Sequence, residues 1–332
     1  MVDCSRRRFV VKNQRGMVLL MVLLIFSVVA ILATTMIERQ AVDLGRASTL
    51  FAQQQARLFA LGAESAAKAG LYLDWEANKE IDHAAEEWTT ERTFPLDPGV
   101  ISLRIQDAQG RFNLNGLTPG GAVAVQESRF RNLLNLLGLD IGIAASWRQW
   151  LDKESNVDNT YLSLSPAYRP AYTPCRHTSE LMLIENVDLD AYAKIEPYIT
   201  CLPASAQLNV NTATNFVLAA LDNNLTLADA DAIIASRGAD GFSSVQDFIG
   251  TSQINRVMQE AGKTEEGEAN NSTGAMVVSD FGVTTEYFEL FARIDLNGRI
   301  GTVEALIHRA IADGSMTTMY RDFSRRAPRE VW

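Results

Sequence analysis

The chain has 332 residues, and its 47% hydrophobic content with only 9 prolines is that of a folded protein of one or two domains, which excludes a disordered chain. The formal net charge is −10, and residues 17–332 alone carry 25 basic and 39 acidic residues, a net charge of −14. Sequence-independent binding to nucleic acid requires Lys and Arg to neutralise phosphates, so this composition argues against a nucleic-acid partner.

Residues 1–16 form a short basic leader, and residues 17–37 contain no charged side chain. As a helix, 21 residues are about 31 Å long, enough to cross the hydrocarbon core. The basic leader predicts a cytoplasmic N-terminus and export of everything downstream. A cleaved secretory signal has a shorter apolar region and a small-residue cleavage site, for which Ala30 and Ala33 are poor candidates. We therefore expect residues 17–37 to remain as a transmembrane anchor.

The predicted helix continues beyond the apolar run. From Glu38 to about Tyr72 the chain is rich in Ala, Gln, Leu and Arg and has no proline, and its glycines each cost only about 1 kcal/mol in a helix. We predict one helix of about 50 residues that begins in the bilayer and ends on a globular head. An apolar stripe is expected to lie on that head: Leu50, Phe51, Leu58, Ala60 and Leu61.

The junction of leader and apolar helix resembles the type III signal of prepilins and pseudopilins. In that family a prepilin peptidase cleaves after the glycine, here Gly16, and methylates the new N-terminus, here Met17. The family usually has a glutamate at the fifth mature position, but Met21 stands there and no acid occurs before Glu38. In lacking this glutamate, the chain resembles the minor K subunit of the type II secretion system.

The missing acid has a physical consequence for assembly. An ionised carboxylate inside a bilayer is costly unless it is paired, and in a filament its partner is the N-terminal amine of a neighbouring subunit. A subunit without the acid can offer its own amine but cannot receive one through this contact. We therefore predict that this subunit lies at an end of the filament.

Alternation of apolar and polar residues predicts strands at both ends of the head. Val100–Asp107 alternates as a half-buried strand does. Thr284–Ile294 and Arg299–Ile311 form two more strand-like runs, and Asn297-Gly298 between them is a strong hairpin signal. The prediction is an α+β fold, with a pilin-like long N-terminal helix on a small antiparallel sheet.

The rest of the head is helix-rich. We predict that residues 38–111 hold the pilin-like helix and first strands, that residues 112–275 form a large inserted α-helical domain, and that residues 276–332 complete the sheet. The acidic tract Thr264–Gly274 is expected to be a loop. K-type pseudopilins resemble this organisation, because they carry a large helical domain inserted in the pilin fold.

A weak internal repeat occurs in the insertion, where Arg111–Asn115 (RFNLN) recurs as Gln207–Asn211 (QLNVN). The second unit resembles a helix-hairpin-helix or SAM-like module. Such modules often bind DNA through glycine amides in the hairpin, but the hairpin here, Asp222–Leu227, has no glycine, and Asp229 and Asp231 follow it. We therefore expect a structural unit and no nucleic acid.

The segment Trp150–Tyr161 is the one most suited to a metal. Its oxygen-bearing side chains Asp152, Glu154, Asp158 and Asn159 are the hard ligands that calcium needs. The glycine and terminal glutamate of an EF-hand are missing, so the residues alone leave a solvated acidic turn as the alternative.

The family resemblance favours calcium. K-type subunits bind calcium at a similar Trp-Leu-Asp stretch that is followed by a tyrosine-proline loop and Ser-Glu-Leu, and this chain has Trp150-Leu-Asp152 and Ser179-Glu-Leu181. The resemblance implies a set of five ligands: Asp152, Glu154, Asp158, Asn159 and Glu180. Glu154 replaces the usual Asp, Val157 and Asn159 stand where acids are typical, and Tyr172 stands where Asn is usual. The smaller number of charges implies weaker binding.

Three cysteines are present, and without the leader Cys175 and Cys201 remain as a pair. In an oxidising compartment a disulfide between them would close a loop and stabilise the fold by roughly 3 kcal/mol. Two unpaired buried thiols are the alternative.

The residues carry few signs of catalysis. The only histidines, His83, His177 and His308, are far apart in sequence, and no nucleophile elbow, Walker loop or dinucleotide fingerprint occurs in the head. We therefore expect that the chain is not an enzyme.

The resemblance implies a minor pseudopilin that initiates and caps the tip of the type II secretion pseudopilus, in support of export across the outer membrane. Its implied location is the bacterial inner membrane, crossed once, with the head in the periplasm. Its implied partners are minor pseudopilins I and J, the major pseudopilin and the prepilin peptidase. The alternatives are a minor pilin of a type IV pilus, a membrane-anchored calcium-dependent hydrolase and a competence-type DNA receptor.

Overall fold

The computed structural model describes residues 15–97, 99–120, 122–263 and 276–324. The leader up to residue 14 and the acidic tract Thr264–Gly274 therefore lie outside the described residues. The chain divides into two compact units, residues 1–55 and residues 56–332. The described part of the first unit consists of the beginning of one helix, α1 (Arg15–Ala77), which has 63 residues. The predicted single long helix is confirmed, and it ends at Ala77.

The end of α1 belongs to the second unit and packs on a sheet through small residues. The buried residues recur every three or four positions, as one face of a helix requires: Ala56, Ala60, Ala63, Ala67 and Leu71. Leu58 is 69% exposed, so the predicted stripe is right for Ala60 and wrong for Leu58. The face of α1 that packs on the sheet carries small residues because helix and sheet approach each other closely there. A Cβ on Gly301 of the sheet would lie 2.7 Å from the Ala56 Cβ.

The sheet has five antiparallel strands in the order β1 (Arg92–Leu96), β2 (Gly99–Asp107), β7 (Tyr287–Leu296), β8 (Arg299–Arg309) and β9 (Met316–Asp322). The predicted strands β2, β7 and β8 are confirmed. Asn297 and Gly298 form the predicted two-residue turn, with φ of 53° and 81°. The short strands β1 and β9 form the edges, and the alternation pattern identified neither of them.

One buried carboxylate joins α1 to the outer strand of the sheet. Glu64 of α1 is 3% exposed and accepts hydrogen bonds from Arg321 and Thr318 of β9. Lys68, one helical turn later, lies 2.9 Å from the same carboxylate. Burial raises the pKa of Glu64, but the hydrogen bonds from Arg321, Thr318 and Lys68 outweigh it and lower the pKa to about 2.

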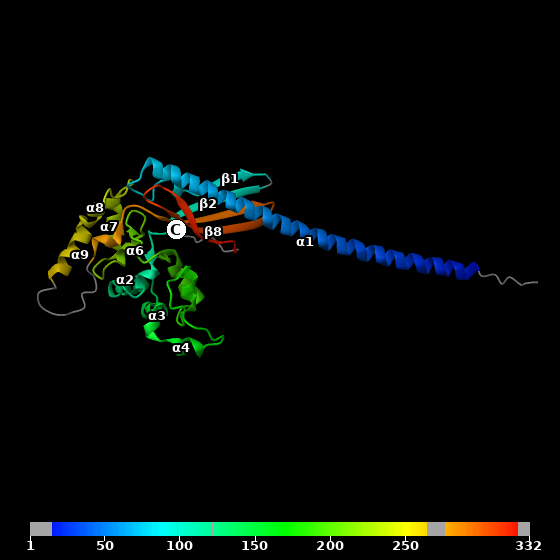
Figure 1. Cartoon of the computed structure of the whole chain (residues 1–332), viewed down its shortest axis with the longest axis horizontal. Helices are drawn as coiled ribbons and strands as arrows, with labels where there is room; N and C mark the ends of the chain where they lie inside the picture. Colours follow the sequence, from blue (N-terminus) through cyan, green and yellow to red (C-terminus); the bar gives the residue numbers. More distant parts are fainter. Residues whose placement is uncertain (1–14, 98, 121, 264–275, 325–332) are drawn as a thin grey trace, which may run out of the picture. The chain divides into compact units, whose positions relative to one another are not determined.

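Residues 108–286 lie between the neighbouring strands β2 and β7 and supply the helices, which gather beside one end of the sheet (Figure 1). The helices are α2 (Val123–Leu136), α3 (Gly142–Leu151), α4 (Asp158–Leu162), α5 (Leu189–Ile195), α6 (Asn215–Ala219), α7 (Leu227–Arg237), α8 (Val245–Ile249) and α9 (Ser252–Lys263). Short parallel pairs join β3 (Phe112–Asn113) to β4 (Ile199–Thr200) and β5 (Leu208–Asn209) to β6 (Phe281–Gly282).

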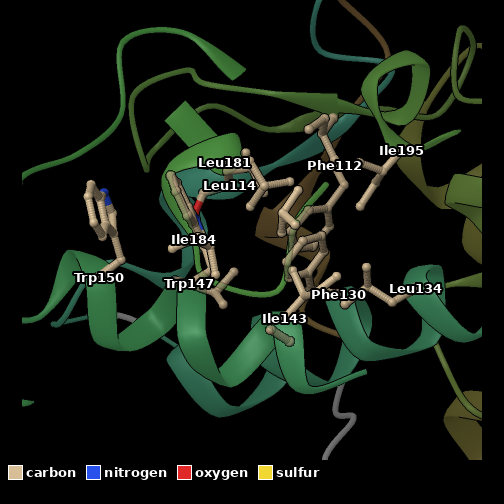
Figure 2. Packing of buried hydrophobic residues seen from close by; sticks show 14 of the residues in the cluster. Phe112, Leu114, Phe130, Leu134, Ile143, Trp147, Trp150, Leu181, Ile184 and Ile195 are labelled. Atoms are coloured by element: carbon tan, nitrogen blue, oxygen red, sulfur yellow. The ribbon is translucent and has the colours of Figure 1, made fainter. Parts of the chain in front are cut away.

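The helical segment has two hydrophobic cores of its own, separate from the core under the sheet. In the first core, the rings of Phe112 and Phe130 stack at 5.1 Å and 5°. Trp147 points from α3 toward Leu114, whose carbonyl accepts its indole N–H at 3.0 Å (Figure 2). The second core surrounds α6, α7 and α9.

The internal repeat marks two equivalent backbone clamps. The buried side chain of Asn115 accepts the N–H of Cys175 at 2.7 Å and donates to the carbonyl of the same residue at 3.0 Å. Asn211 makes the same pair of bonds with Phe242, at 2.7 and 3.0 Å. A buried amide that satisfies both groups of one residue fixes a loop that lacks regular structure of its own. The repeated motif therefore encodes two anchors for loops.

We expect Asn211→Ala to lower the free energy of unfolding by about 2–3 kcal/mol, because it leaves the buried N–H and C=O of Phe242 without partners. The measurement is chemical unfolding of the full chain in detergent. The exposed Asn223→Ala is the matched control and should change stability by less than about 0.5 kcal/mol. Equal stability of the two variants would contradict the clamp.

Candidate functional site

The residues predicted for processing lie at the start of α1. Gly16 is in open space, since a Cβ there would have no neighbour within 4 Å, and Met17 is exposed. Met21, in the place of the expected acid, is 63% exposed. By length and composition, the helix Gly16–Ala77 is able to cross a membrane, and its most apolar window has a mean hydropathy of 3.0. An apolar, fully exposed surface of this length is compatible with a bilayer around it.

The structure does not gather the five predicted calcium ligands into one cluster. Asp152 caps a 3-10 turn, with its Oδ1 accepting the N–H of Glu154 at 2.9 Å. Asp158 accepts the hydroxyl of Tyr172 at 2.8 Å and lies 3.8 Å from the Arg169 guanidinium. Among the described residues, one group of three or more acids, histidines or cysteines lies close enough together to hold a metal ion. None of the four predicted acidic ligands belongs to that group.

Glu180 has a structural role of its own. Its Oε1 accepts the backbone N–H groups of Arg176 and His177, at 2.7 and 3.2 Å, and so caps the turn Thr178–Leu183. An oxygen that accepts two backbone amides is poorly placed to bind a metal as well. The other four predicted residues, Asp152, Glu154, Asp158 and Asn159, lie in one short segment and carry the oxygen atoms that calcium prefers. The prediction of calcium stays a prediction.

His177 lies between a serine and a glutamate, an arrangement that superficially matches a hydrolase. Its Nδ1 is 2.8 Å from Ser179 Oγ, and its Nε2 is 3.3 Å from Glu304 Oε1. However, Nδ1 also accepts the backbone N–H of Ser179 at 3.1 Å, as a helix cap does. Tyr320 donates to the same Glu304 oxygen, so the group attaches the helical segment to strands β8 and β9. Its geometry is that of a structural contact.

Cys175 and Cys201, the predicted pair, form a disulfide in the structure. The sulfur atoms of Cys175 and Cys201 are bonded, and the bond closes a loop of 26 residues. Cys175 is the residue that Asn115 clamps, and Asn115 also donates to the carbonyl of Leu202, next to Cys201. The disulfide therefore lies beside Asn115, the last residue of the first repeat motif.

A cluster of three acids occurs where sequence reasoning predicted no site. Asp74 at the end of α1 and Asp82 and Glu86 in the following loop have carboxylate oxygens within 4.8 Å of one another. Arg309 of β8, 3% exposed, donates through Nη2 to both oxygens of Asp82 at 2.6 Å. His83 lies 3.7 Å from Glu86. The members are 235 residues apart at the extremes, so no local motif could reveal them.

Arg309 supplies a positive charge to the cluster, and two of its three acids have raised pKa values. The guanidinium of Arg309 occupies the position where a cation would neutralise Asp82. Burial first, and then the charges of Glu86 and Asp82, raise the pKa of Asp74 to about 7, although Arg309 and His83 act in the opposite direction. Burial also raises the pKa of Glu86. Crowding of acids in a buried place thus favours the protonated form of Asp74 and of Glu86.

This shift predicts how stability depends on pH. The pKa of Asp74 is higher in the folded chain than its ordinary 3.8, so its contribution is fully present below about pH 4 and is lost as pH rises through about 7. We expect Asp74→Asn to gain stability over the wild type progressively across this window, as measured by thermal unfolding of the full chain. The exposed Asp240→Asn should give a constant difference. A pH-independent difference for Asp74→Asn would contradict the raised pKa.

Comparisons with known proteins agree with the fold. Two family descriptions, both of type II secretion system (T2SS) protein K, match residues 110–204 and 208–265. A type II secretion system protein K from Pseudomonas aeruginosa is 32% identical over 95% of this chain and 94% of its own length. One from Klebsiella pneumoniae is 35% identical over 71% of this chain and 79% of its own.

A solved structure is also similar. A chain in the crystal structure of the GspK-GspI-GspJ complex from the enterotoxigenic Escherichia coli type 2 secretion system matches with a TM-score of 0.71 and 25% identity. The match covers 85% of this chain and 100% of that chain. The long helix, antiparallel sheet and helical segment are therefore features of a known fold.

Proposed function

The chain belongs to the type II secretion system protein K family, and we propose that it initiates and caps the tip of the secretion pseudopilus as a non-enzymatic minor pseudopilin. The observation that carries the tip position is the absence of any acid from Met17 to Ile37, with Met21 where the family usually has a glutamate. Such a subunit presents its amine to a neighbour and has no carboxylate to receive one.

The size of the head supports the same position. Residues 108–286 lie between β2 and β7, and they carry two hydrophobic cores beyond the core under the sheet. A subunit stacked above would have to clear this bulk, which is not required at a tip. The proposed action is assembly, in which α1 associates with the helices of other subunits in the membrane.

The proposed partners follow from the similar solved structure. That structure is a complex of GspK with GspI and GspJ, and we infer that this chain assembles with the corresponding I and J minor pseudopilins, above the major pseudopilin. The proposed location is the bacterial inner membrane, crossed once, with the head in the periplasm. The disulfide Cys175–Cys201 supports an oxidising compartment for the head.

The alternatives from the sequence are less well supported. A minor pilin of a type IV pilus shares the N-terminal signal, but the family matches are to secretion proteins. For a hydrolase, the group around His177 is the nearest arrangement among the described residues, and its contacts are those of a cap. The second repeat lacks the hairpin glycines of a DNA-binding module.

Replacement of Gly16 tests the proposed processing. We expect Gly16→Leu to remain uncleaved and to block secretion, whereas the wild type begins at methylated Met17 when the mature chain is examined by mass spectrometry. Gly45→Leu is the matched control, because Gly45 also lies on α1 with nothing within 4 Å. Normal secretion by the Gly16 variant would contradict the proposal.

Calcium binding in the segment 152–159 is a separate proposal. It rests on the oxygens of Asp152 and Asp158 at its two ends and on the family resemblance, with Glu180 retained in its cap. Addition of a calcium chelator to the full chain should lower the melting temperature, and Asp152→Asn should remove most of that difference. Asp190→Asn, exposed on α5, should leave it unchanged. A melting temperature that is the same with and without the chelator would contradict the proposal.

A further inference from the structure

A cavity of about 200 Å³ lies beside α2, between the first repeat and the segment that leads into the second. We call it the Arg129 cavity. The residues that carry the argument, all of which line it, are Arg111, Phe112, Arg129 and Asp280. The cavity is separate from the processing site, the predicted calcium ligands and the acidic cluster around Arg309.

Arg129 is buried in the wall of this cavity with most of its donors unused. The residue is 4% exposed, and its Nη1 pairs with Asp280 Oδ2 at 2.9 Å. Its Nε and Nη2 are buried without a hydrogen-bond partner among the described residues. A buried, unsatisfied donor costs about 1–3 kcal/mol, and a charged donor costs more. A native fold that keeps such an edge therefore calls for a partner that completes it.

The geometry of the unused edge selects the chemistry of that partner. Nε–H and the neighbouring Nη2–H of a guanidinium are parallel donors, and this fork matches the two oxygens of a carboxylate. One face of the group is already covered, because the Phe281 ring lies 5.6 Å from the Arg129 Cζ. The edge formed by Nε and Nη2 is thus the part of Arg129 that remains for a ligand, and because it is buried in this structure, the guanidinium must rotate for a ligand in the cavity to reach it.

The lining carries two arginines and one acid, and it encloses a small volume. Arg111 also lines the cavity, while its Nη1 pairs with Glu289 at 2.7 Å, and Asp280 is the one acid in the lining. Phe112 and Phe130 each follow one of these arginines, and their stacked rings give the cavity a rigid apolar support. A volume of about 200 Å³ is below that of a typical drug-sized site and suits a few heavy atoms.

We propose that the Arg129 cavity binds a carboxylate group, held as a two-point contact by Nε and Nη2 of Arg129. This site goes beyond the assembly function. Its ligand lies where α2 meets the 3-10 turn Val278–Asp280, which precedes β6, so an occupied site strengthens the attachment of α2 to the second repeat. The carboxylate belongs either to a free organic acid or to a protein chain.

The first experiment measures the melting temperature of the full chain in detergent as sodium formate is added, with sodium chloride at the same ionic strength as the reference. We expect a saturable rise in formate for the wild type. Arg129→Lys keeps the charge beside Asp280 but loses the fork, so half-saturation should need at least about tenfold more formate. Arg131→Lys, exposed on the same helix, should behave as the wild type does.

A second measurement does not depend on any variant being stable. In the ¹⁵N–¹H spectrum of the arginine Nε groups of the wild-type chain, one signal should shift with formate and saturate at the concentration that the melting curves give. Equal effects of formate and chloride, no shifted Nε signal, or a formate response unchanged in Arg129→Lys would each overturn the proposal.

A third arm distinguishes the two sources of the carboxylate. A short peptide with a free C-terminal carboxylate is compared with its amidated form in the same melting assay. A free-acid peptide that saturates at a concentration at least tenfold below that of formate, with no effect of the amide, identifies a protein terminus as the source. Saturation by formate alone identifies a small organic acid.

Discussion

The buried ion pair between Arg309 and Asp82 is the contact on which the second unit depends. Arg309 reaches from β8 to the loop after α1, and it also donates to the carbonyl of Thr285 in front of β7. The backbone carbonyl of Asp82 in turn accepts a hydrogen bond from Asn209 of the second repeat. A buried pair of this kind is strongly destabilising when one partner is lost, because the other charge is left alone. The helix, the sheet and the helical segment therefore share one anchor.

Asn209 extends that anchor into a network of buried polar groups. Its amide also donates to Asp107 at the end of β2 and to the hydroxyl of Thr285. Asp107 accepts from Thr212 as well, and its own burial, which exceeds the effect of these bonds, raises its pKa to about 6. These groups bond to one another in the interior, and a buried network of this kind favours a single arrangement of the elements that it joins. The repeat motif thus serves both as a clamp within the helical segment and as its attachment to the sheet.

Several other contacts hold the second unit together with this anchor. After the apolar beginning of α1, the strands and helices of the second unit are joined by buried charges and by a disulfide. Contacts of this kind resist separation of the elements that they join. Small residues on the buried face of α1 add to this, because Ala56 and Gly301 let the helix approach the sheet closely.

The local features of the fold were predictable from the residues. Strand alternation identified β2, β7 and β8, and Asn297-Gly298 identified their hairpin, because these signals depend on neighbours in sequence. The edge strand β9 was missed, since its residues alternate only between half-buried and exposed positions. The stripe at Leu58 was misassigned because hydrophobicity alone does not say which face of a helix meets a sheet at close range.

The sequence by itself determined the apolar N-terminal helix, the missing acid at Met21 and the class of fold, because all three follow from runs of neighbouring residues. Tertiary structure alone decided the rest. Glu180 accepts two backbone N–H groups in the cap of a 3-10 turn, and Asp74, Asp82 and Arg309 form a cluster that no spacing in the sequence indicated. The unsatisfied edge of Arg129 likewise exists only once the chain has buried it. Burial and contacts between segments distant in sequence set these properties, and neither can be predicted from neighbouring residues.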